Sequence, residues 1–240
     1  MPFYSINPYG DTVDMQTNSK ALIVLSGGQD STTCLYWAKK RYKIIETITF
    51  DYGQRHQIEI DCARKIAAIA QVSNTVIPIN SFTPLGGNSL ISDQIPVNND
   101  LQKNGLPNTF VPGRNLIFLT IAAAFAYNKG ILDLITGVCE TDYSGYPDCR
   151  SDTMKALEAS ISLGMEADFK IITPLMHLSK AQSIKLAEEV GAFEALGFSH
   201  TCYNGVYPPC HKCPACTIRA RGFEEAELVD PLINRANNEK

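Results

Sequence analysis

The stretch LSGGQDSTTCL combines glycines, hydroxyls and a carboxylate in the pattern of a phosphate-binding loop. Gly27 and Gly28 allow positive φ and a close approach of the backbone to a ligand. Ser26, Asp30 and Ser31 lie at the start of a predicted helix, where free N–H groups and the positive end of the helix dipole favour an anion. We therefore expect a nucleotide to contact the following residues of this stretch: Leu25, Ser26, Gly27, Gly28, Gln29, Asp30, Ser31, Thr32, Thr33, Cys34 and Leu35.

Other phosphate-binding signatures are absent from the sequence. No glycine is followed by lysine, so there is no Walker A loop, and no two glycines lie two positions apart, so the dinucleotide fingerprint is missing. A loop that holds phosphates without the Walker lysine suits a cleavage other than simple γ-phosphoryl transfer. The alternative is an ordinary glycine-rich turn capped by Asp or Ser.

Four of the eight cysteines lie together in CYNGVYPPCHKCPAC, at Cys202, Cys210, Cys213 and Cys216. One distant thiol followed by two overlapping C-x-x-C units puts four soft ligands in a short loop, which suits a closed, structural Zn²⁺ site. The same four thiolates can hold an iron–sulfur cluster, and free thiols are a further alternative. A disulfide framework is disfavoured because the chain carries no signal peptide. His211 is expected to be a bystander.

Polar side chains follow two further predicted strands. His56, in FDYGQRHQ, and Glu140, Asp142 and Asp148, in GVCETDYSGYPDCR, are expected to contact a substrate. Carboxylates in such a turn suit Mg²⁺ or a hydrogen-bond donor of a ligand, although Asp also populates ordinary turns. Arg114, in FVPGRN, can meet a phosphate or carboxylate with two parallel hydrogen bonds. A surface arginine at a helix start is the alternative for that residue.

Strand-like and helix-like runs alternate along the chain and predict an α/β fold. This alternation implies a parallel sheet with helices on both faces and a ligand beyond the carboxyl ends of the strands. We divide the chain into an irregular lead-in (1–20), a nucleotide-binding α/β domain (21–195) and a segment with the cysteine loop and a C-terminal helix (196–240). The periodicity predicts strands at 21–25, 44–53, 75–79, 131–138 and 169–175, and helices from 31 onward and at 57–70, 116–127, 153–163 and 179–191.

Composition excludes several classes of protein. Of the 240 residues, 45% are hydrophobic and 19% charged, which allows a sizeable core. The formal charge is −4 and no basic block occurs, so we expect no nucleic-acid partner. The N-terminus has no apolar signal region, and the most apolar run is shorter than the ~20 residues of a membrane span. We expect a cytoplasmic protein that does not bind membranes, and a homodimer, although the sequence alone does not set the oligomeric state.

The sequence SGGQDS resembles the loop of the ATP pyrophosphatase (PP-loop) family. This resemblance implies an adenine-nucleotide α-hydrolase-like fold, binding of ATP, attack at the α-phosphorus and release of pyrophosphate. Six further motifs, in the same order, narrow the resemblance to the branch of the family that acts in queuosine biosynthesis. These are TFDYGQRH, NTFVPGRN, TGVCETDYSGYPDCR, SLGM, TPLMHLSKA and TCYNG with CHKCPAC.

That branch implies an ATP-dependent C–N ligase that converts 7-carboxy-7-deazaguanine and ammonia into the nitrile through adenylated intermediates, with ATP, Mg²⁺ and Zn²⁺ as cofactors. Lys180 resembles the lysine that related enzymes place on the departing pyrophosphate, Asp30 holds Mg²⁺ or caps the helix, and Arg114 is a second phosphate candidate. We expect these three residues to be catalytic. For Lys180 the alternative is a solvated side chain in the first turn of a helix, where the dipole disfavours a cation. The residues before Lys20 depart from the family pattern and receive no role.

Two other functions fit parts of the sequence. A tRNA thiolase of the same family also combines adenylation with C-x-x-C cysteines, but it needs clustered basic residues to bind tRNA. Residues 205–240 instead contain five residues of each charge sign. A non-catalytic module that binds ATP and zinc explains the phosphate loop and the cysteines, but it gives no purpose to the loops around Arg114 and Glu140. ATP consumption that depends on a deazapurine acid would separate the three possibilities.

Overall fold

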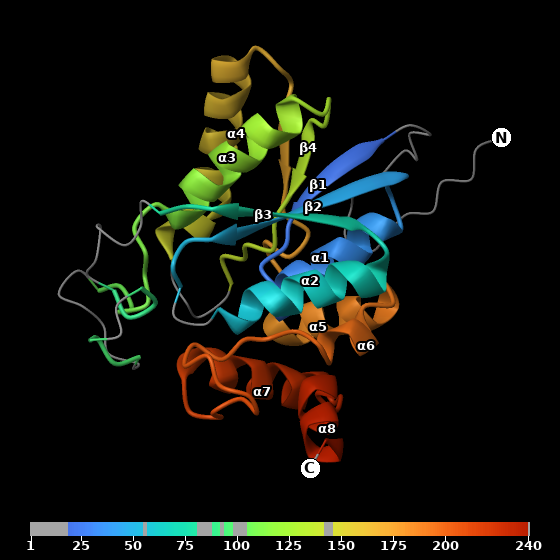
Figure 1. Ribbon diagram of the computed structural model, residues 1–240, viewed down its shortest axis with the longest axis vertical. Coiled ribbons are helices and arrows are strands. Elements are labelled where there is room, and N and C mark those ends of the chain that lie inside the picture. The colour runs from blue at the N-terminus through green and yellow to red at the C-terminus, as the bar shows by residue number, and fades with distance from the viewer. Residues whose placement is uncertain are drawn as a thin grey trace.

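A parallel sheet forms the centre of the molecule (Figure 1). The computed structural model describes residues 19–54, 57–80, 88–91, 94–97, 105–141 and 146–239, so nearly all of the expected lead-in lies outside the described residues. Within them the strand order is β3-β2-β1-β4-β5, and every neighbouring pair is parallel, which confirms the predicted fold class. The strands are β1 (Lys20–Val24), β2 (Ile44–Asp51), β3 (Ser73–Pro78), β4 (Asp133–Ile135) and β5 (Lys170–Ile172).

Helices cover both faces of this sheet, as expected (Figure 1). Successive residues of a strand point to opposite faces, so Ala21 and Ile23 pack with one helical layer while Leu22 packs with the other. The first layer contains α1 (Gln29–Lys39), α2 (Ile58–Ala70), α5 (Lys180–Glu189) and α6 (Phe193–Leu196), and the second contains α3 (Arg114–Tyr127) and α4 (Ser151–Met165). No helix in the described part of the chain is long and apolar enough to cross a membrane.

The strand order places a topological switch between β1 and β4. From the central strand β1 the chain builds β2 and β3 on one side, then crosses to build β4 and β5 on the other. The loops that follow β1 and β4 therefore diverge at the carboxyl edge of the sheet. A ligand is expected in the crevice between such loops.

Strand β4 is shorter than the sequence pattern predicts, because its last part passes over the start of α1. A side chain at Gly137 would place its Cβ atom 3.0 Å from both the carbonyl carbon of Asp30 and the amide nitrogen of Ser31. The backbone leaves the sheet at this crossing. Helix α5, in contrast, begins where the sequence predicts, with Ser179 and Gln182 forming a reciprocal capping box.

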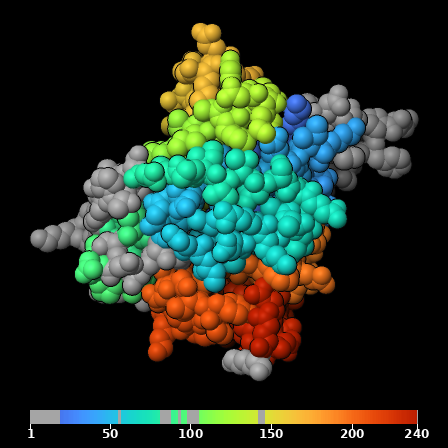
Figure 2. Space-filling view, viewed as in Figure 1, coloured from blue at the N-terminus to red at the C-terminus, as the bar shows by residue number. Residues whose placement is uncertain are grey.

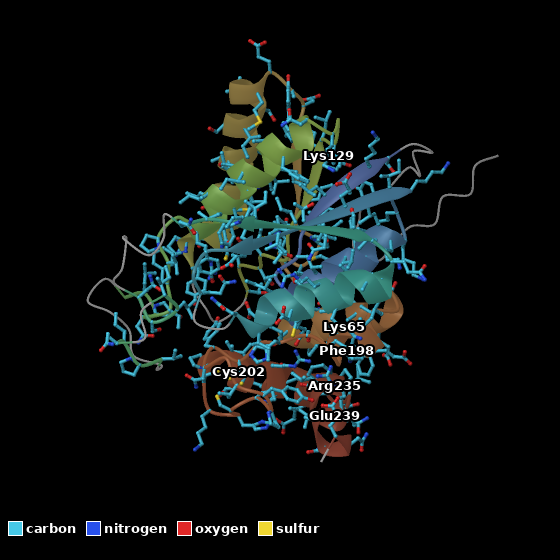
Figure 3. The ribbon with its side chains drawn as sticks, in the orientation of Figure 1. Lys65, Lys129, Phe198, Cys202, Arg235 and Glu239 are labelled. Carbon is cyan, nitrogen blue, oxygen red and sulfur yellow. The ribbon has the colours of Figure 1, made fainter. Side chains whose placement is uncertain are left out.

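The C-terminal segment packs below the first helical layer. The segment contains two helices, α7 (Pro214–Ala226), which includes Cys216, and α8 (Pro231–Asn238), where one helix was expected. Helix α7 packs against α5, and Figure 2 shows this orange and red segment directly below the cyan surface of α2. Phe198 lies between the side chains of Lys65 and Arg235, which places α2 and α8 on either side of its ring (Figure 3).

Candidate functional site

The loop between β1 and α1 is shaped to receive an anion. Gly27 has a φ of +86°, and a Cβ atom at this position would overlap the carbonyl oxygen of Glu59 and approach the amide nitrogen of Ala63 to 2.8 Å. Only glycine fits there. Gly28 is the N-cap of α1, and no side chain in the described part of the chain caps this helix. The first N–H groups of α1 are therefore oriented towards the cavity for a ligand.

Hydroxyl groups hold this loop in shape. The Ser26 N–H donates to Ser31 Oγ at 3.2 Å, the two serine Oγ atoms lie 3.1 Å apart, and Ser31 Oγ donates to the Gly28 carbonyl at 3.1 Å. Ser26, Gly28, Gln29, Asp30 and Ser31 all line one cavity. The Nε2 group of Gln29 is buried and has no hydrogen-bond partner among the described residues. A buried donor of this kind fits a nucleotide oxygen.

Of the other residues in the expected nucleotide contact set, Leu25 also lines the cavity, whereas the four that follow Ser31 in α1 do not. Thr32, Thr33, Cys34 and Leu35 are buried and do not line the cavity. Thr32 Oγ1 donates to the Gly28 carbonyl at 2.8 Å, and Thr33 Oγ1 donates to the Gln29 carbonyl at 3.1 Å. These side chains support the loop from below.

The cavity has a volume of about 260 Å³ and lies at the carboxyl edge of the sheet. The loops after β1 and β4 border one half, and the end of β2, the start of α3 and the segment 200–203 border the other. One half is polar and contains the phosphate loop, and the other carries aromatic rings. The cavity thus places an anion-binding half directly beside an aromatic half.

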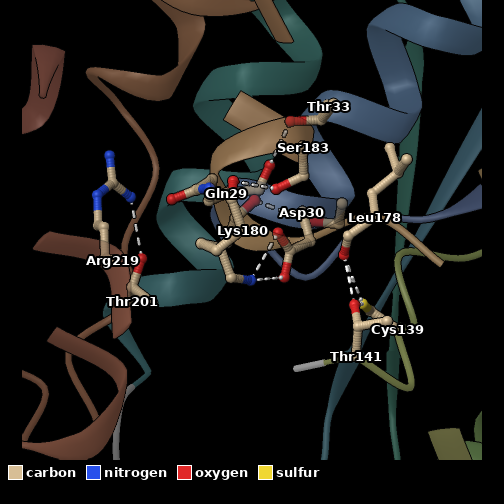
Figure 4. Close-up of polar contacts among 12 residues, drawn as sticks. Gln29, Asp30, Thr33, Cys139, Thr141, Leu178, Lys180, Ser183, Thr201 and Arg219 are labelled. Atoms are coloured by element: carbon tan, nitrogen blue, oxygen red, sulfur yellow. Dashed lines mark hydrogen bonds and ion pairs between the residues drawn. The ribbon is translucent and has the colours of Figure 1, made fainter. Parts of the chain in front are cut away.

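Asp30 and Lys180 form an ion pair in the polar half (Figure 4). Lys180 Nζ lies 3.1 Å from Asp30 Oδ1 and 2.9 Å from Oδ2, and the two side chains are 16% and 28% exposed. Lys180 is the first residue of α5, where a helix dipole alone would disfavour it. The carboxylate of Asp30 offsets that effect, so the structure brings together two of the three expected catalytic residues.

Arg114 is a partly buried cation in the other half of the cavity. Its Nη1 group lies 3.4 Å from the Tyr52 hydroxyl, and its guanidinium carbon lies 5.9 Å from the centre of the Tyr146 ring. Burial alone would lower the pKa of Arg114, but the oxygens of Tyr52, Tyr146 and Asp148 outweigh burial and raise it. Arg114 therefore stays charged at the start of α3.

Aromatic side chains form the wall around Arg114. Phe50 and Phe118 stack with ring centres 4.4 Å apart, and Tyr52 meets Phe118 at 5.2 Å. Burial raises the pKa of the Tyr52 and Tyr203 hydroxyls, so both stay protonated at neutral pH. Glu59, in the first turn of α2, also lines the cavity.

The sequence patterns did not identify these aromatic residues or Glu59 as site residues. Tyr52 directly follows the last residue of β2, and Tyr203 is the neighbour of Cys202, so their positions in loops were a usable signal. Glu59 had no such signal, because it falls inside the apolar periodicity of α2.

The expected substrate-binding carboxylates have different surroundings. Asp148 is buried, does not line the cavity, and accepts a hydrogen bond from the Asn115 N–H at 3.0 Å, which anchors the start of α3. Glu140 Oε2 accepts a hydrogen bond from the Ser151 N–H at 3.0 Å, and its Oε1 lies 3.1 Å from His177 Nδ1. Both carboxylates thus anchor helix starts around the site. His56 and Asp142 lie outside the described residues.

Figure 4 also shows how loops around the polar half are tied together. Cys139 Sγ donates to the Leu178 carbonyl at 3.3 Å, and the Thr141 hydroxyl donates to the same oxygen. These two bonds join the loop after β4 to the loop before α5. The position of Lys180 is therefore linked to the cavity wall.

The segment before the cysteine loop forms a further part of the cavity wall. The His200 N–H donates to the Gly27 carbonyl at 2.9 Å, which attaches this segment to the phosphate loop. Arg219 of α7 is buried and donates to Ser199 Oγ at 2.8 Å, to Thr201 Oγ1 at 3.0 Å and to Asp230 at 2.6 and 2.8 Å. Helix α7 thereby holds the wall in place.

The four clustered cysteines fit a tetrahedral metal ion. Their sulfur atoms lie within 4.8 Å of one another, and the Sγ atoms of Cys210 and Cys216 are 4.0 Å apart. Four sulfurs at about 2.3 Å from a zinc ion would be roughly 3.8 Å apart. Hydrogen bonds from Cys213 and Cys216 lower the pKa of Cys202, which favours a thiolate. His211 is outside this group, and Figure 3 places Cys202 within the C-terminal segment.

Comparisons with known proteins identify the family of this chain. The family model described as "Queuosine biosynthesis protein QueC" matches residues 20–227. The 7-cyano-7-deazaguanine synthase of Chromobacterium violaceum is 57% identical over 230 residues, 95% of this chain and 98% of that protein. The protein of the same name from Laribacter hongkongensis is 59% identical over 216 residues, 90% and 94% of the two chains. A third protein of this name, from Clostridium botulinum, is 46% identical over 210 residues, which are 87% of this chain and 96% of that protein.

Two solved structures share the fold at low sequence identity. A 4-thiouridine synthetase, solved with RNA and bound ATP, has a TM-score of 0.51 at 18% identity and covers 92% of this chain and 54% of its own. The U34-tRNA thiolase NcsA from Methanococcus maripaludis, solved with its [4Fe-4S] cluster, has a TM-score of 0.50 at 17% identity over 91% and 67%. With the family match over most of its length, this chain belongs to the queuosine biosynthesis protein QueC family.

Proposed function

We propose that this protein is an ATP-dependent ligase that converts 7-carboxy-7-deazaguanine and ammonia into 7-cyano-7-deazaguanine. The observation that carries the proposal is a single cavity that joins the phosphate loop, the Asp30–Lys180 pair and a partly buried arginine with aromatic neighbours. Relatives 46–59% identical over nearly their whole length are named 7-cyano-7-deazaguanine synthase, which supports the same substrate.

The chemical difficulty is a carboxylate, which resists nucleophiles until one oxygen becomes a leaving group. Attack of this carboxylate on the α-phosphorus of ATP gives an acyl-adenylate and pyrophosphate, and ammonia then displaces AMP to form the amide. A second adenylation, on the amide oxygen, is followed by loss of AMP and a proton to give the nitrile. No nucleophile from the protein is needed, so its task is positioning and electrostatic stabilisation.

The residues of the polar half suit that task. The N–H groups at the start of α1 and the Gln29 amide would hold phosphate oxygens, while Lys180 would leave Asp30 to contact the departing pyrophosphate. Asp30 would then be free to hold Mg²⁺, which neutralises phosphate charge when bound. Lys180 and Asp30 already pair with each other. Nucleotide binding would therefore replace this ion pair with two others, Lys180 with pyrophosphate and Asp30 with Mg²⁺.

The aromatic half suits the deazapurine. Tyr52, Phe118 and Tyr203 offer flat surfaces for a planar ring, and Arg114 offers two parallel donors for an oxyanion, either a phosphate or the substrate carboxylate. The carboxylate of Glu59 matches the ring N–H and the amino group on the guanine-like edge. We propose that Glu140 and Asp148 contribute to substrate binding by shaping these walls, and that His56 and Asp142 also bind the substrate.

The cysteine cluster is proposed to hold one Zn²⁺ ion through Cys202, Cys210, Cys213 and Cys216. Four thiolates leave no position for water, so this ion would be structural. Elemental analysis of purified protein tests the metal: one zinc per chain is expected, and iron in its place would contradict the proposal.

We further propose that the enzyme works in the cytoplasm as a homodimer on small molecules, without nucleic acid. The net charge of −4 supports the last point, because counterion release on binding RNA needs clustered basic residues. Light scattering tests the dimer, and a tRNA shift assay tests the lack of RNA binding.

The deciding experiment combines two readouts on protein incubated with the deazapurine acid, ATP and ammonium. Mass spectrometry should find the nitrile, and chromatography should find AMP and pyrophosphate in step with it. ADP and phosphate would mean that the loop cleaves the other bond. ATP consumption that ignores the acid would contradict the ligase function.

A further inference from the structure

Helix α7 lies in the C-terminal segment, yet it borders the side chain of Lys180. A Cβ atom added at Gly222 would overlap Lys180 Cγ and would lie 3.0 Å from both Lys180 Cβ and Ile184 Cδ1. The stem of Lys180 thus occupies space that exists because residue 222 has no side chain. We propose that Gly222 is a positioning residue, which sets the path of Lys180 to Asp30 and to the pyrophosphate of the reaction.

The Lys180 stem has little freedom to avoid a side chain at position 222. Its Cα atom is at the first residue of α5, and the capping box of Ser179 and Gln182 fixes that start. Its Nζ group contacts both oxygens of Asp30 (Figure 4). The overlap involves Cγ and Cβ, the end of the side chain nearest the backbone, so rotation of the outer bonds cannot relieve it.

Helix α7 is also unable to retreat easily. Arg219 lies one turn before Gly222 and is buried, with bonds to Asp230, Ser199 and Thr201. Figure 4 shows the bond from Arg219 to Thr201 beside the Lys180–Asp30 pair. Since both helices are anchored, an added methyl group at position 222 displaces the lysine stem.

This inference rests on the role proposed above for Lys180. When a group that stabilises the transition state is displaced by about 1 Å, the rate can fall by as much as about 10²-fold. We therefore expect Gly222→Ala to lower kcat by roughly 10- to 100-fold. The KM for ATP should change little, because the atoms nearest to an added Cβ at Gly222 belong to Lys180 and Ile184 and not to the phosphate loop.

The test compares Gly222→Ala with Gly164→Ala and Lys180→Ala. Gly164 is a helical glycine in α4 with no atom within 4 Å of an added Cβ, so its substitution should leave kcat unchanged. The double variant Gly222→Ala, Lys180→Ala should have the kcat of Lys180→Ala alone. A merely structural effect of the added methyl group would instead lower kcat further in that background.

The possible failures are distinguishable. Wild-type kcat in Lys180→Ala would overturn the role of that lysine and this inference with it. An impaired Lys180→Ala beside a fully active Gly222→Ala would overturn the inference alone. If Gly222→Ala is insoluble, the variant Gly222→Ala, Ile184→Val removes the contact with Ile184 Cδ1 and keeps the overlap with Lys180. That variant should still lose kcat, and normal turnover in it would equally overturn the inference.

Discussion

Replacing Lys180 with alanine should slow the reaction more than it weakens ATP binding. Lys180 Nζ lies 2.9 Å from Asp30 Oδ2, and the lysine side chain is 16% exposed. Two unit charges about 4 Å apart interact by ~4 kcal/mol at an effective dielectric constant of about 20. Removing one preorganised donor to a developing anion typically costs about 2.7–4 kcal/mol, or ~10²- to 10³-fold in kcat. The two magnitudes agree, so we expect kcat to fall by ~10²- to 10³-fold.

The assay is steady-state release of pyrophosphate with saturating deazapurine acid and ammonium, with ATP varied. The KM for ATP should change by less than about threefold, because the departing pyrophosphate gains charge only during bond cleavage. Lys185→Ala is the matched control, since that lysine is exposed on the same helix. Loss of a partly buried ion pair should lower the free energy of unfolding by about 1–3 kcal/mol.

Asp30→Asn separates the two partners of the pair. It should also reduce kcat strongly if the carboxylate holds Mg²⁺, while the neutral amide oxygen can still accept a hydrogen bond from Lys180. If Lys180 served only to neutralise Asp30, the double variant would turn over as fast as Asp30→Asn alone. That result, or a kcat for Lys180→Ala within twofold of wild type, would refute the assignment of Lys180 to pyrophosphate.

Four further predictions concern other parts of the structure. Gly27→Ala should lower the free energy of unfolding by about 2 kcal/mol or more, as measured by urea denaturation, and should abolish ATP binding, as measured by calorimetry. Gly130→Ala is its control, since that glycine also has positive φ but no described atom within 4 Å of an added Cβ. Equal losses of unfolding free energy in both variants would refute the idea that overlap with Glu59 destabilises Gly27→Ala. Arg219→Ala should lower the free energy of unfolding, measured by urea denaturation, by about 3–5 kcal/mol, because it leaves the largely buried carboxylate of Asp230 without its cation. Cys213→Ser should lower zinc content, solubility and the melting temperature before it changes the chemistry; full zinc content by elemental analysis would contradict this. Burial raises the pKa of Cys62 to about 11, so its alkylation, followed by peptide mass spectrometry, should accelerate about tenfold per pH unit between pH 8 and 10, and a plateau below pH 9 would contradict it.

Local patterns predicted much of the fold. The apolar run of β1, the period of α2 and the Ser179 cap depend on neighbouring residues, and each appears near its predicted position. The cysteine spacing likewise predicted a cluster that the structure brings within metal-binding distance. The end of β4 depends on a distant element instead, because its backbone must pass the start of α1 at Gly137.

The site was less predictable because its contacts join distant segments. Asp30 and Lys180 are 150 residues apart, and only the misplaced charge at the start of α5 hinted at a partner. Thr201 and Tyr203 reach the cavity because the chain folds back after α6, which no periodic pattern records. Glu59 was hidden within the apolar face of a helix.

The attachment of His200 to the phosphate loop has a consequence for synthesis of the protein. The sheet is complete once residue 172 has been made, but the wall formed by Thr201, Tyr203 and Arg219 comes from the last fifth of the chain. A nascent chain on the ribosome can therefore fold its sheet well before it possesses a finished cavity. A chain that ended after α6 would lack this wall of the cavity, and also the part of the core that Phe223 and Ala226 of α7 supply.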